Sequence, residues 1–311
     1  MLSRKIILST AGFPPVKALV EKSPIFRPMV NRFVAGVTFE QALQHGLALV
    51  DQGFSTSLDY LGENTLNEEE ALAAKAAYIK MLEGIAAANV RQVGPREPMN
   101  ISIKLTQCGL DQGEAFCEAN FREVLAVAKD LGNFVRVDME SSAYTDRTLD
   151  MIERVLPDLP NTGTVLQTML RRTPDDLDRL IRLGARTRLV KGAYLEPESV
   201  AYPAKADVDQ AYKVMARRML AEANFPAFAT HDTSMIESVK SAAKELGVGP
   251  DRFEFQMLYG IRRDLQDALR NEGYGVRVYI PYGDGWYPYF TRRLAERPAN
   301  MLFVMKAMFK R

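Results

Sequence analysis

The sequence predicts an α/β protein whose strands close into a (β/α)8 TIM-type barrel. Two observations lead to this fold class. Short runs rich in β-branched and other apolar residues occur eight times along the 311-residue chain, and a stretch with helix-forming features follows each run. Strands that alternate with helices are typical of parallel sheets with crossover helices. Eight such units in about 250 residues favour a barrel over an open sheet.

The predicted strands follow one another without a sequence repeat, a low-complexity tract or a long linker between them. They are Ser55–Leu61, Ile101–Leu105, Phe134–Met139, Thr164–Met169, Arg188–Lys191, Ala227–His231, Phe253–Leu258 and Val276–Ile280. Polar side chains near the end of each run then mark the point where a strand gives way to a loop.

The intervals between the strands are typical of capped helices. Asn67 precedes three glutamates and an alanine-rich run to Val90, so the asparagine can cap free N–H groups and the acids complement the helix dipole. Thr173 and Pro174 are expected as the cap and first residue of a helix that ends at Gly184. The other expected helices are Ala115–Gly132, Asp146–Leu156, Asp207–Ala223, Thr233–Gly247, Arg262–Gly273 and Tyr287–Lys310, the last with a break near Pro298.

The first 50 residues precede the first predicted strand, so we divide the chain into a helical arm (1–50) and a catalytic barrel (51–311), a single domain overall. Apolar residues recur in the arm near helical spacing at Phe39, Leu43, Leu47 and Val50. The segment is expected to form either an arm beside the barrel or a plug over its base. The C-terminal helix is expected to lie over the mouth of the barrel.

Composition excludes several classes of protein. Forty basic residues against 39 acidic ones leave no basic surplus of the kind that nucleic-acid binders show. Two cysteines and two histidines are scattered along the chain and lack the close pairing of a structural zinc site, so we expect no metal. No stretch reaches the roughly 18 apolar residues that span a bilayer. We expect a cytoplasmic protein that makes at most peripheral contact with a membrane.

Active sites of parallel barrels lie at the C-terminal ends of the strands. Each of the eight predicted strands carries polar side chains near this end, and these are Asp59 and Glu63, Lys104, Asp138, Gln167, Lys191 with Tyr194, His231 with Asp232, Gln256, and Tyr279 with Tyr282. Any one of them could be structural: Asp138 could cap the next helix, and Lys104 could pair with Asp59. Because all eight ends converge on one mouth, we expect an active site there.

Two further features fit a ligand site. Arg292 and Arg293 can grip a carboxylate with bidentate hydrogen bonds, although a solvated basic pair on an exposed helix is the alternative. Tyr289, three residues before Arg292, is expected to place an aromatic surface beside that arginine. Gly192, directly after a strand, would let the backbone approach a ligand closely. No glycine-rich phosphate loop follows a strand, so the sequence does not support a Rossmann nucleotide site.

At these residues the sequence resembles the proline dehydrogenase family, which includes stand-alone bacterial enzymes and a domain of proline utilization A. The resemblance runs from Ser55 to about Val304. It rests on three long motifs and four short ones: Ser102–Thr106, Arg188–Tyr194, Tyr289–Arg293, Val137–Met139, Leu166–Gln167, Thr230–His231 and Phe255–Gln256. The chain departs from relatives at Gly283–Tyr287, Leu195 and Tyr259.

The resemblance implies noncovalently bound FAD and the oxidation of L-proline to Δ1-pyrroline-5-carboxylate, by hydride transfer to flavin N5 and electron transfer to a membrane quinone. The FAD contacts it implies are Asp138, Met139, Gln167, Arg188, Val190, Lys191, Gly192, Ala193, Lys205, Thr230, His231 and Gln256. The substrate contacts it implies are Lys104, Tyr279, Tyr289, Arg292 and Arg293. Asp138 and Arg188 are expected to be catalytic, and Glu63 is expected to close the pocket as a gate.

Two alternatives from other classes remain open. Lys104 or Lys191 could be the nucleophile of a Schiff-base lyase, a chemistry that barrels often host. The chain could also be an amino-acid-binding module without catalysis. For Arg188, the alternative to a place beside the flavin is a salt bridge with Asp138 at the barrel rim.

Overall fold

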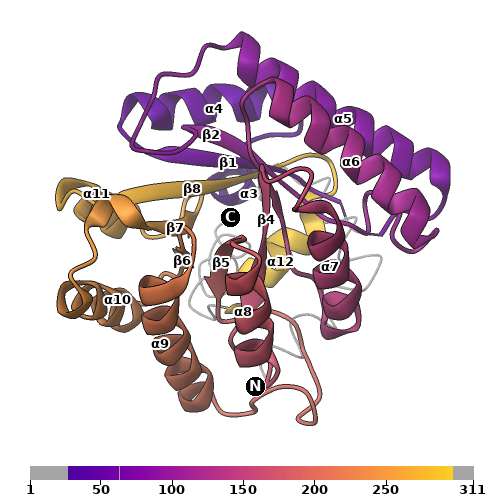
Figure 1. Ribbon diagram of the computed structural model, residues 1–311. Helices are drawn as coiled ribbons and strands as arrows, with labels where there is room; N and C mark the ends of the chain where they lie inside the picture. The colour runs from indigo at the N-terminus through magenta and orange to yellow at the C-terminus, as the bar shows by residue number, and fades with distance from the viewer. Residues whose placement is uncertain (1–26, 63, 297–311) are drawn as a thin grey trace, which may run out of the picture.

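A computed structural model describes residues 27–62 and 64–296. Eight parallel strands close into a barrel, each paired with its neighbours in sequence and the last with the first (Figure 1). The strands are β1 (Ser55–Tyr60), β2 (Met99–Ile103), β3 (Val135–Val137), β4 (Thr162–Gln167), β5 (Arg186–Val190), β6 (Ala227–Ala229), β7 (Glu254–Leu258) and β8 (Gly275–Tyr282). The predicted (β/α)8 fold class is confirmed.

A helix follows each strand. These helices are α5 (Glu68–Ala87), α6 (Glu114–Asp130), α7 (Ser142–Val155), α8 (Thr173–Arg182), α9 (Lys205–Glu222), α10 (Thr233–Leu246), α11 (Arg263–Asn271) and α12 (Trp286–Glu296). The predicted cap of α5 is confirmed, because the Asn67 side chain accepts from the Glu70 N–H at 2.9 Å. The predicted cap of α8 is wrong by one residue: Thr173 begins the helix, and its hydroxyl donates to the Gln167 carbonyl.

Helix α12, the last described helix, lies differently from the other helices. Helices α5 to α11 surround the strands, whereas α12 lies inside this ring in the view of Figure 1. Phe290 of α12 packs with Leu61, which follows β1. Trp286 packs edge-to-face against Phe290, with ring centres 5.7 Å apart. The C-terminal helix therefore lies at the strand ends, as expected, and its predicted continuation to Lys310 falls outside the described residues.

Two helices precede the barrel. Helix α4 (Phe39–Asp51) packs on β1 and β8 and takes the place in the helix ring that the helix after β8 would have (Figure 1). Helix α3 (Arg27–Phe33) lies at the strand ends, where Phe33 packs with Phe290 of α12. The described part of the arm is helical as expected, but a plug over the base is wrong for these residues. The division of the chain at residue 50 stays a prediction.

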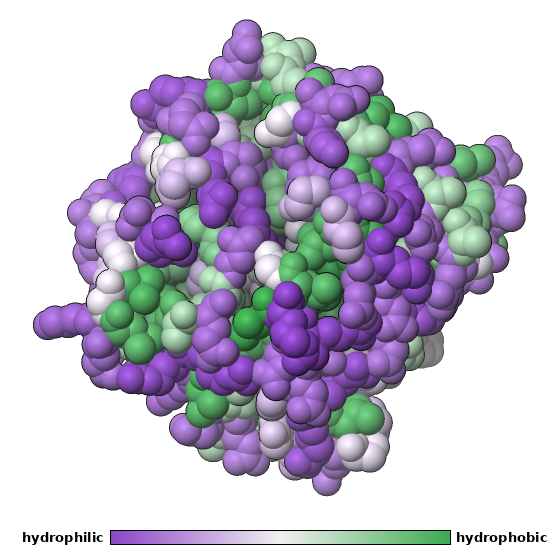
Figure 2. All heavy atoms as spheres, viewed as in Figure 1, coloured by the Kyte–Doolittle hydropathy of each residue, from purple (hydrophilic) through white to green (hydrophobic). Residues whose placement is uncertain are grey.

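Side chains on the outer face of the strands are apolar, and side chains that point into the barrel are polar. In β8, Val276, Val278 and Ile280 belong to the hydrophobic core between barrel and helices. Arg277 and Tyr279 alternate with them, and the Tyr279 hydroxyl reaches Asp138, directly after β3, across the barrel. Bonds between strands that are not neighbours show that these polar side chains fill the barrel itself. The side of the molecular surface that Figure 2 shows is mostly hydrophilic, with hydrophobic residues in separate patches.

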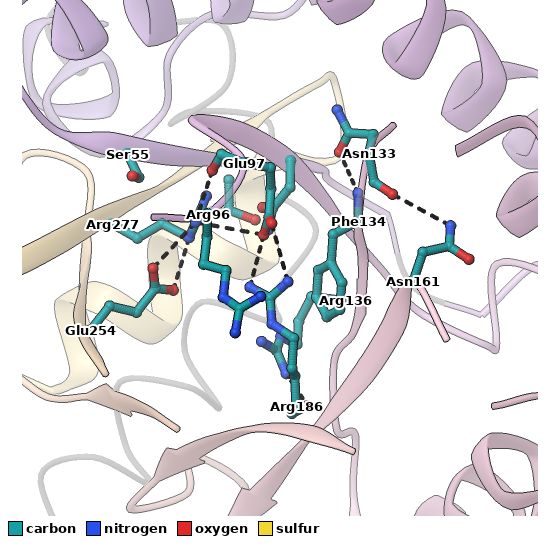
Figure 3. A network of polar contacts seen from close by, with 12 residues as sticks. Ser55, Arg96, Glu97, Asn133, Phe134, Arg136, Asn161, Arg186, Glu254 and Arg277 are labelled. Atoms are coloured by element: carbon teal, nitrogen blue, oxygen red, sulfur yellow. Dashed lines mark hydrogen bonds and ion pairs between the residues drawn. The ribbon is translucent and has the colours of Figure 1, made fainter. Parts of the chain in front are cut away.

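An ion-pair network closes the end of the barrel where the strands begin (Figure 3). Arg277 contacts Glu254 at 2.9 Å and Glu97 at 3.6 Å. Arg186 grips the Glu97 carboxylate with both terminal nitrogens, at 3.1 and 2.9 Å. Burial raises the pKa of the Glu97 carboxyl, but Arg277 and Arg186 outweigh burial and hold the pKa at about 2, below the ordinary 4.5.

The low pKa of Glu97 predicts a loss of stability in acid. A carboxylate whose pKa is lower in the folded than in the unfolded state stabilises the fold above the unfolded pKa, and this stabilisation is lost as pH falls toward the folded pKa. Between about pH 6 and pH 3 we expect Glu97 to account for about 2 kcal/mol of lost unfolding free energy.

Urea unfolding of Glu97→Gln across this pH range measures the effect. The variant is less stable than the wild type at neutral pH, because two guanidiniums lose a partner, but its stability falls less on acidification. Glu123→Gln, whose carboxylate is 58% exposed, is the matched control and keeps the wild-type pH dependence. An unchanged acid dependence in Glu97→Gln would contradict the assignment.

Candidate active site

A cavity of about 1680 Å3 opens at the C-terminal ends of the strands. This volume exceeds the roughly 300–1,000 Å3 of most small-molecule sites, so a large cofactor and a small substrate fit together. The residues predicted for cofactor and substrate all line it: Lys104, Asp138, Met139, Gln167, Arg188, Val190, Lys191, Gly192, Ala193, Lys205, Thr230, His231, Gln256, Tyr279, Tyr289, Arg292 and Arg293. The predicted gate, Glu63, lies outside the described residues.

Arg188 on β5 lies at the centre of the polar contacts. Its Nη1 donates to Asp138 Oδ1 at 2.6 Å, and its Nη2 donates to Ser102 Oγ at 3.2 Å. Its Nε donates to Gln256 Oε1, and the guanidinium lies 5.3 Å from the centre of the Tyr279 ring. Bonds to Ser102 on β2, to Gln256 on β7 and to Asp138 directly after β3 fix the guanidinium in one orientation. The salt bridge with Asp138 is therefore present, and a role beside a cofactor stays a prediction.

Asp138 joins Arg188 to Tyr279. The Tyr279 hydroxyl donates to Asp138 Oδ2 at 2.6 Å, so both oxygens of this carboxylate have a donor. Burial raises the pKa of Tyr279, and the negative charges of Asp138 and Asp59 raise it further. The phenol therefore stays protonated and donates at neutral pH. Sequence reasoning allowed Asp138 to be a helix cap, but Ser141 precedes α7 instead.

Lys104 forms a buried ion pair with Asp59, the pairing that the sequence suggested. The ammonium lies 2.9 Å from Asp59 Oδ1, and both side chains are almost fully buried. Burial lowers the pKa of Lys104, but Asp59 and Asp138 outweigh it and raise the pKa above the ordinary 10.5. A nucleophilic lysine needs a lowered pKa. The electrostatics thus argue against a Schiff-base lyase that uses Lys104.

Lys191 also forms ion pairs, in its case with two carboxylates. Its Nζ lies between Asp209 at 2.5 Å and Asp232 at 2.7 Å. Lys205, one turn before Asp209 on α9, pairs with the same two acids. Sequence reasoning missed Asp209, although the spacing of four residues from Lys205 on a helix was a usable indication. Two carboxylates around Lys191 make it a poor nucleophile and a well-positioned cation.

Gly192, in the loop after β5, lines the cavity between Lys191 and Ala193. It has φ of +106°, a conformation that residues with a side chain rarely adopt. A Cβ at this position would also collide with the side chain of Met169. Glycine is therefore required here to fit beside Met169, and the close approach of a ligand to its backbone stays a prediction.

Two neutral side chains complete the floor of the cavity. Gln167 Nε2 donates to the Glu140 carbonyl at 2.8 Å, which sets the orientation of its amide. His231 Nε2 accepts from the Leu258 N–H at 2.9 Å. This bond assigns the His231 proton to Nδ1 when the ring is neutral.

Helix α12 brings Arg292 and Arg293 to the cavity, so both are more than a solvated pair on an exposed helix. The guanidinium of Arg293 lies over the Tyr289 ring, 5.2 Å from its centre. Residues four apart share a helix face, which accounts for this contact. The expected position of Tyr289 beside Arg292 stays a prediction.

Sequence reasoning missed Glu254, which accepts a hydrogen bond from Gln256 and so orients its amide in the site. Gln256 Nε2 donates to Glu254 Oε1, and this leaves Gln256 Oε1 to accept from Arg188. Alternation along a strand places residues two apart on one face, so Glu254 and Gln256 both point inward. It also missed α3, whose Arg32 and Phe33 line the cavity.

A (β/α)8 barrel with a charged cavity at the C-terminal ends of its strands defines a TIM-barrel enzyme. A model of the proline dehydrogenase family matches residues 42–306. Proline dehydrogenase of Deinococcus radiodurans is 41% identical and aligns over 99% of this chain and 98% of its own length. The bifunctional protein PutA of Escherichia coli is 30% identical over 97% of this chain. The chain belongs to the proline dehydrogenase family.

Solved structures give the same result for the fold. Proline utilization A from Bdellovibrio bacteriovorus, inactivated by N-propargylglycine, superposes with a TM-score of 0.82 at 26% identity over 87% of this chain. This chain spans only 32% of that protein and 26% of Escherichia coli PutA. Among the described helices, none is both long and apolar enough to cross a membrane.

Proposed function

We propose that the chain binds FAD noncovalently at the strand ends and oxidises L-proline to Δ1-pyrroline-5-carboxylate. The observation that carries the proposal is one large cavity in which a fixed cation, Arg188, lies on the barrel and an arginine pair lies on α12. When bound, FAD supplies the hydride acceptor, its N5 atom. The cavity volume fits a cofactor of this size.

The arginines of α12 bind the substrate carboxylate in this proposal. Guanidinium groups match a carboxylate with paired hydrogen bonds, so Arg292 and Arg293 fix one end of proline. Tyr289 packs on the pyrrolidine ring, and Lys104 and Tyr279 shape the pocket below it. Holding the ring carbon next to nitrogen against the acceptor is the main catalytic contribution of the protein.

Arg188 acts electrostatically in this proposal. A permanent cation beside the flavin favours the reduced, anionic form, and Asp138, Ser102 and Gln256 keep its guanidinium in place. The electrons then pass to a quinone, which brings the protein into peripheral contact with a membrane from the cytoplasm. N-propargylglycine, named for the Bdellovibrio protein, is a secondary amine with a carboxylate, as proline is, and this supports the substrate class.

Arg188→Met tests the electrostatic role. Loss of roughly 1–3 kcal/mol of charge-assisted interaction lowers the flavin midpoint potential by tens of millivolts, since about 30 mV corresponds to 1.4 kcal/mol in a two-electron couple. Reduction of the flavin by proline slows with it. Arg179→Met, which removes an ion-paired arginine on α8 outside the cavity, is the control and leaves the potential unchanged. If Arg188→Met lowers the melting temperature but not the potential, Arg188 is only a rim salt bridge.

A further inference from the structure

The end of the barrel opposite the cavity carries more positive than negative charge. Four arginines and two glutamates meet there: Arg96, Arg136, Arg186, Arg277, Glu97 and Glu254 (Figure 3). Both glutamates pair with Arg277, and Glu97 also pairs with Arg186. Within residues 27–62 and 64–296, Arg96 and Arg136 pair with no carboxylate. The cluster therefore has an excess of two positive charges.

Arg136 is the more deeply buried of these two cations. It is 2% exposed, and its guanidinium donates to the backbone carbonyls of Thr164 and Arg186. Its positive charge lies 4.9 Å from the Phe134 ring centre. The two carbonyls accept its hydrogen bonds and the Phe134 ring covers it, but no carboxylate balances its positive charge. An uncompensated buried charge destabilises the fold.

Arg96 is partly buried and points into the same cluster (Figure 3). Its guanidinium stacks on Phe225, 4.5 Å from the ring centre, and its buried Nε–H has no acceptor in the described part of the chain. Arg186, about nine-tenths buried, lies 5.4 Å from the same ring and has a second buried Nε–H without an acceptor there. Two buried donors on cations thus flank one phenyl ring.

A cavity of about 570 Å3 adjoins Arg96 on its outer side. Phe225 and Arg252 line it as well, and so do the carboxylate-bearing residues Glu222 and Asp251. Burial lowers the pKa of the Arg96 guanidinium, and the positive charges of Arg186 and Arg252 lower it further, while Glu97 and Glu254 oppose the shift. Of these arginines, Arg96 and Arg252 line the cavity, which is open to a small solute.

We propose that this basal cavity binds a phosphate group at Arg96, with Arg186 and Arg252 beside it. A phosphate group carries close to two negative charges at neutral pH and offsets the excess positive charge of the cluster, of which Arg96 lines the cavity. Guanidinium donors match phosphate oxygens in geometry as well as in charge. The cavity is larger than inorganic phosphate, so the group can come from free phosphate or from a small phosphate ester.

Thermal unfolding of the full-length holoenzyme tests the site. Inorganic phosphate is titrated against chloride at constant ionic strength, and a second series uses glycerol 3-phosphate. Binding to the folded state raises Tm by about 3–5 °C at about 100 times Kd. A larger rise with the ester identifies an ester as the occupant, and a rise with inorganic phosphate alone identifies free phosphate.

Four variants test where on the protein phosphate binds. Arg96→Gln abolishes the rise, and because the Arg96 guanidinium bonds to no described residue, the variant folds. Arg252→Gln, an exposed residue of the cavity, reduces the rise. Arg182→Gln, an exposed arginine of α8, and Arg292→Gln, at the opposite mouth, keep it. The proposal is overturned if the wild type shows no rise with either phosphate, or if Arg96→Gln keeps the full rise.

Discussion

Replacing Arg292 or Arg293 by methionine lowers kcat/KM for proline about 10- to 150-fold in each case, since a charge-assisted hydrogen bond contributes roughly 1.5–3 kcal/mol. Both arginines line the cavity from α12, and the proposed partner is the substrate carboxylate. Because methionine keeps much of the side-chain length without the charge, the loss reports on recognition of the carboxylate. Steady-state kinetics with proline measures the effect in each variant.

FAD content separates this effect from loss of the cofactor. The predicted FAD contacts lie at the strand ends and in the loops that follow them, so both variants keep the wild-type ratio of flavin to protein. Affinity for a carboxylate-bearing proline analogue falls in parallel with kcat/KM. Arg182→Met, an exposed arginine on α8, is the control and behaves as the wild type. Unchanged analogue binding in both variants would show that the pair does not recognise the carboxylate.

Lys104→Met lowers the free energy of unfolding by about 3–5 kcal/mol, because removal of one partner leaves a buried charge without compensation. Asp59, the partner that remains, is 1% exposed. The double variant Lys104→Met with Asp59→Leu regains much of this loss, since apolar groups of similar volume replace both charges. Urea unfolding of Lys104→Met, of Asp59→Leu and of the double variant gives the three free energies.

An exposed ion pair provides the matched comparison. Lys80 and Glu40 are each more than half exposed, so Lys80→Met costs about 1 kcal/mol or less. The account of the Lys104 pair is wrong if Lys104→Met costs no more than Lys80→Met. It is also wrong if the double variant is as unstable as the sum of the two single variants.

The residues that line the cavity could be predicted from the sequence more completely than the residues that hold them in place. Parallel barrels bring the C-terminal ends of their strands together, so polar residues at these ends, such as Lys104, Asp138 and Gln167, could be assigned to one mouth without any contact information. The pairing of Lys104 with Asp59 could be suggested for the same reason. Glu254 could not be assigned to the site, because it lies at the start of β7, away from the C-terminal strand ends.

The starts of several strands could not be predicted for a related reason. Strands β2, β4 and β5 each begin two residues before the predicted start, at Met99, Thr162 and Arg186. Arg186 and Thr162 are polar, although they are buried within the strands, so an apolar pattern does not reveal them. The position of α4 depends on packing against β8, and the position of α3 depends on packing against α12. The helical spacing of apolar residues within each segment carries no information about these long-range contacts.

The visible spectrum of the purified protein, recorded before and after anaerobic addition of L-proline, tests the central claim most directly. The proposal predicts a flavin spectrum with about one FAD per chain, and proline bleaches it as the flavin is reduced. The Arg292→Met variant shows the same initial spectrum and slower bleaching. A protein that takes up no FAD, or that binds FAD which proline does not reduce, would contradict the proposed function and leave an amino-acid-binding module or a lyase as the alternative.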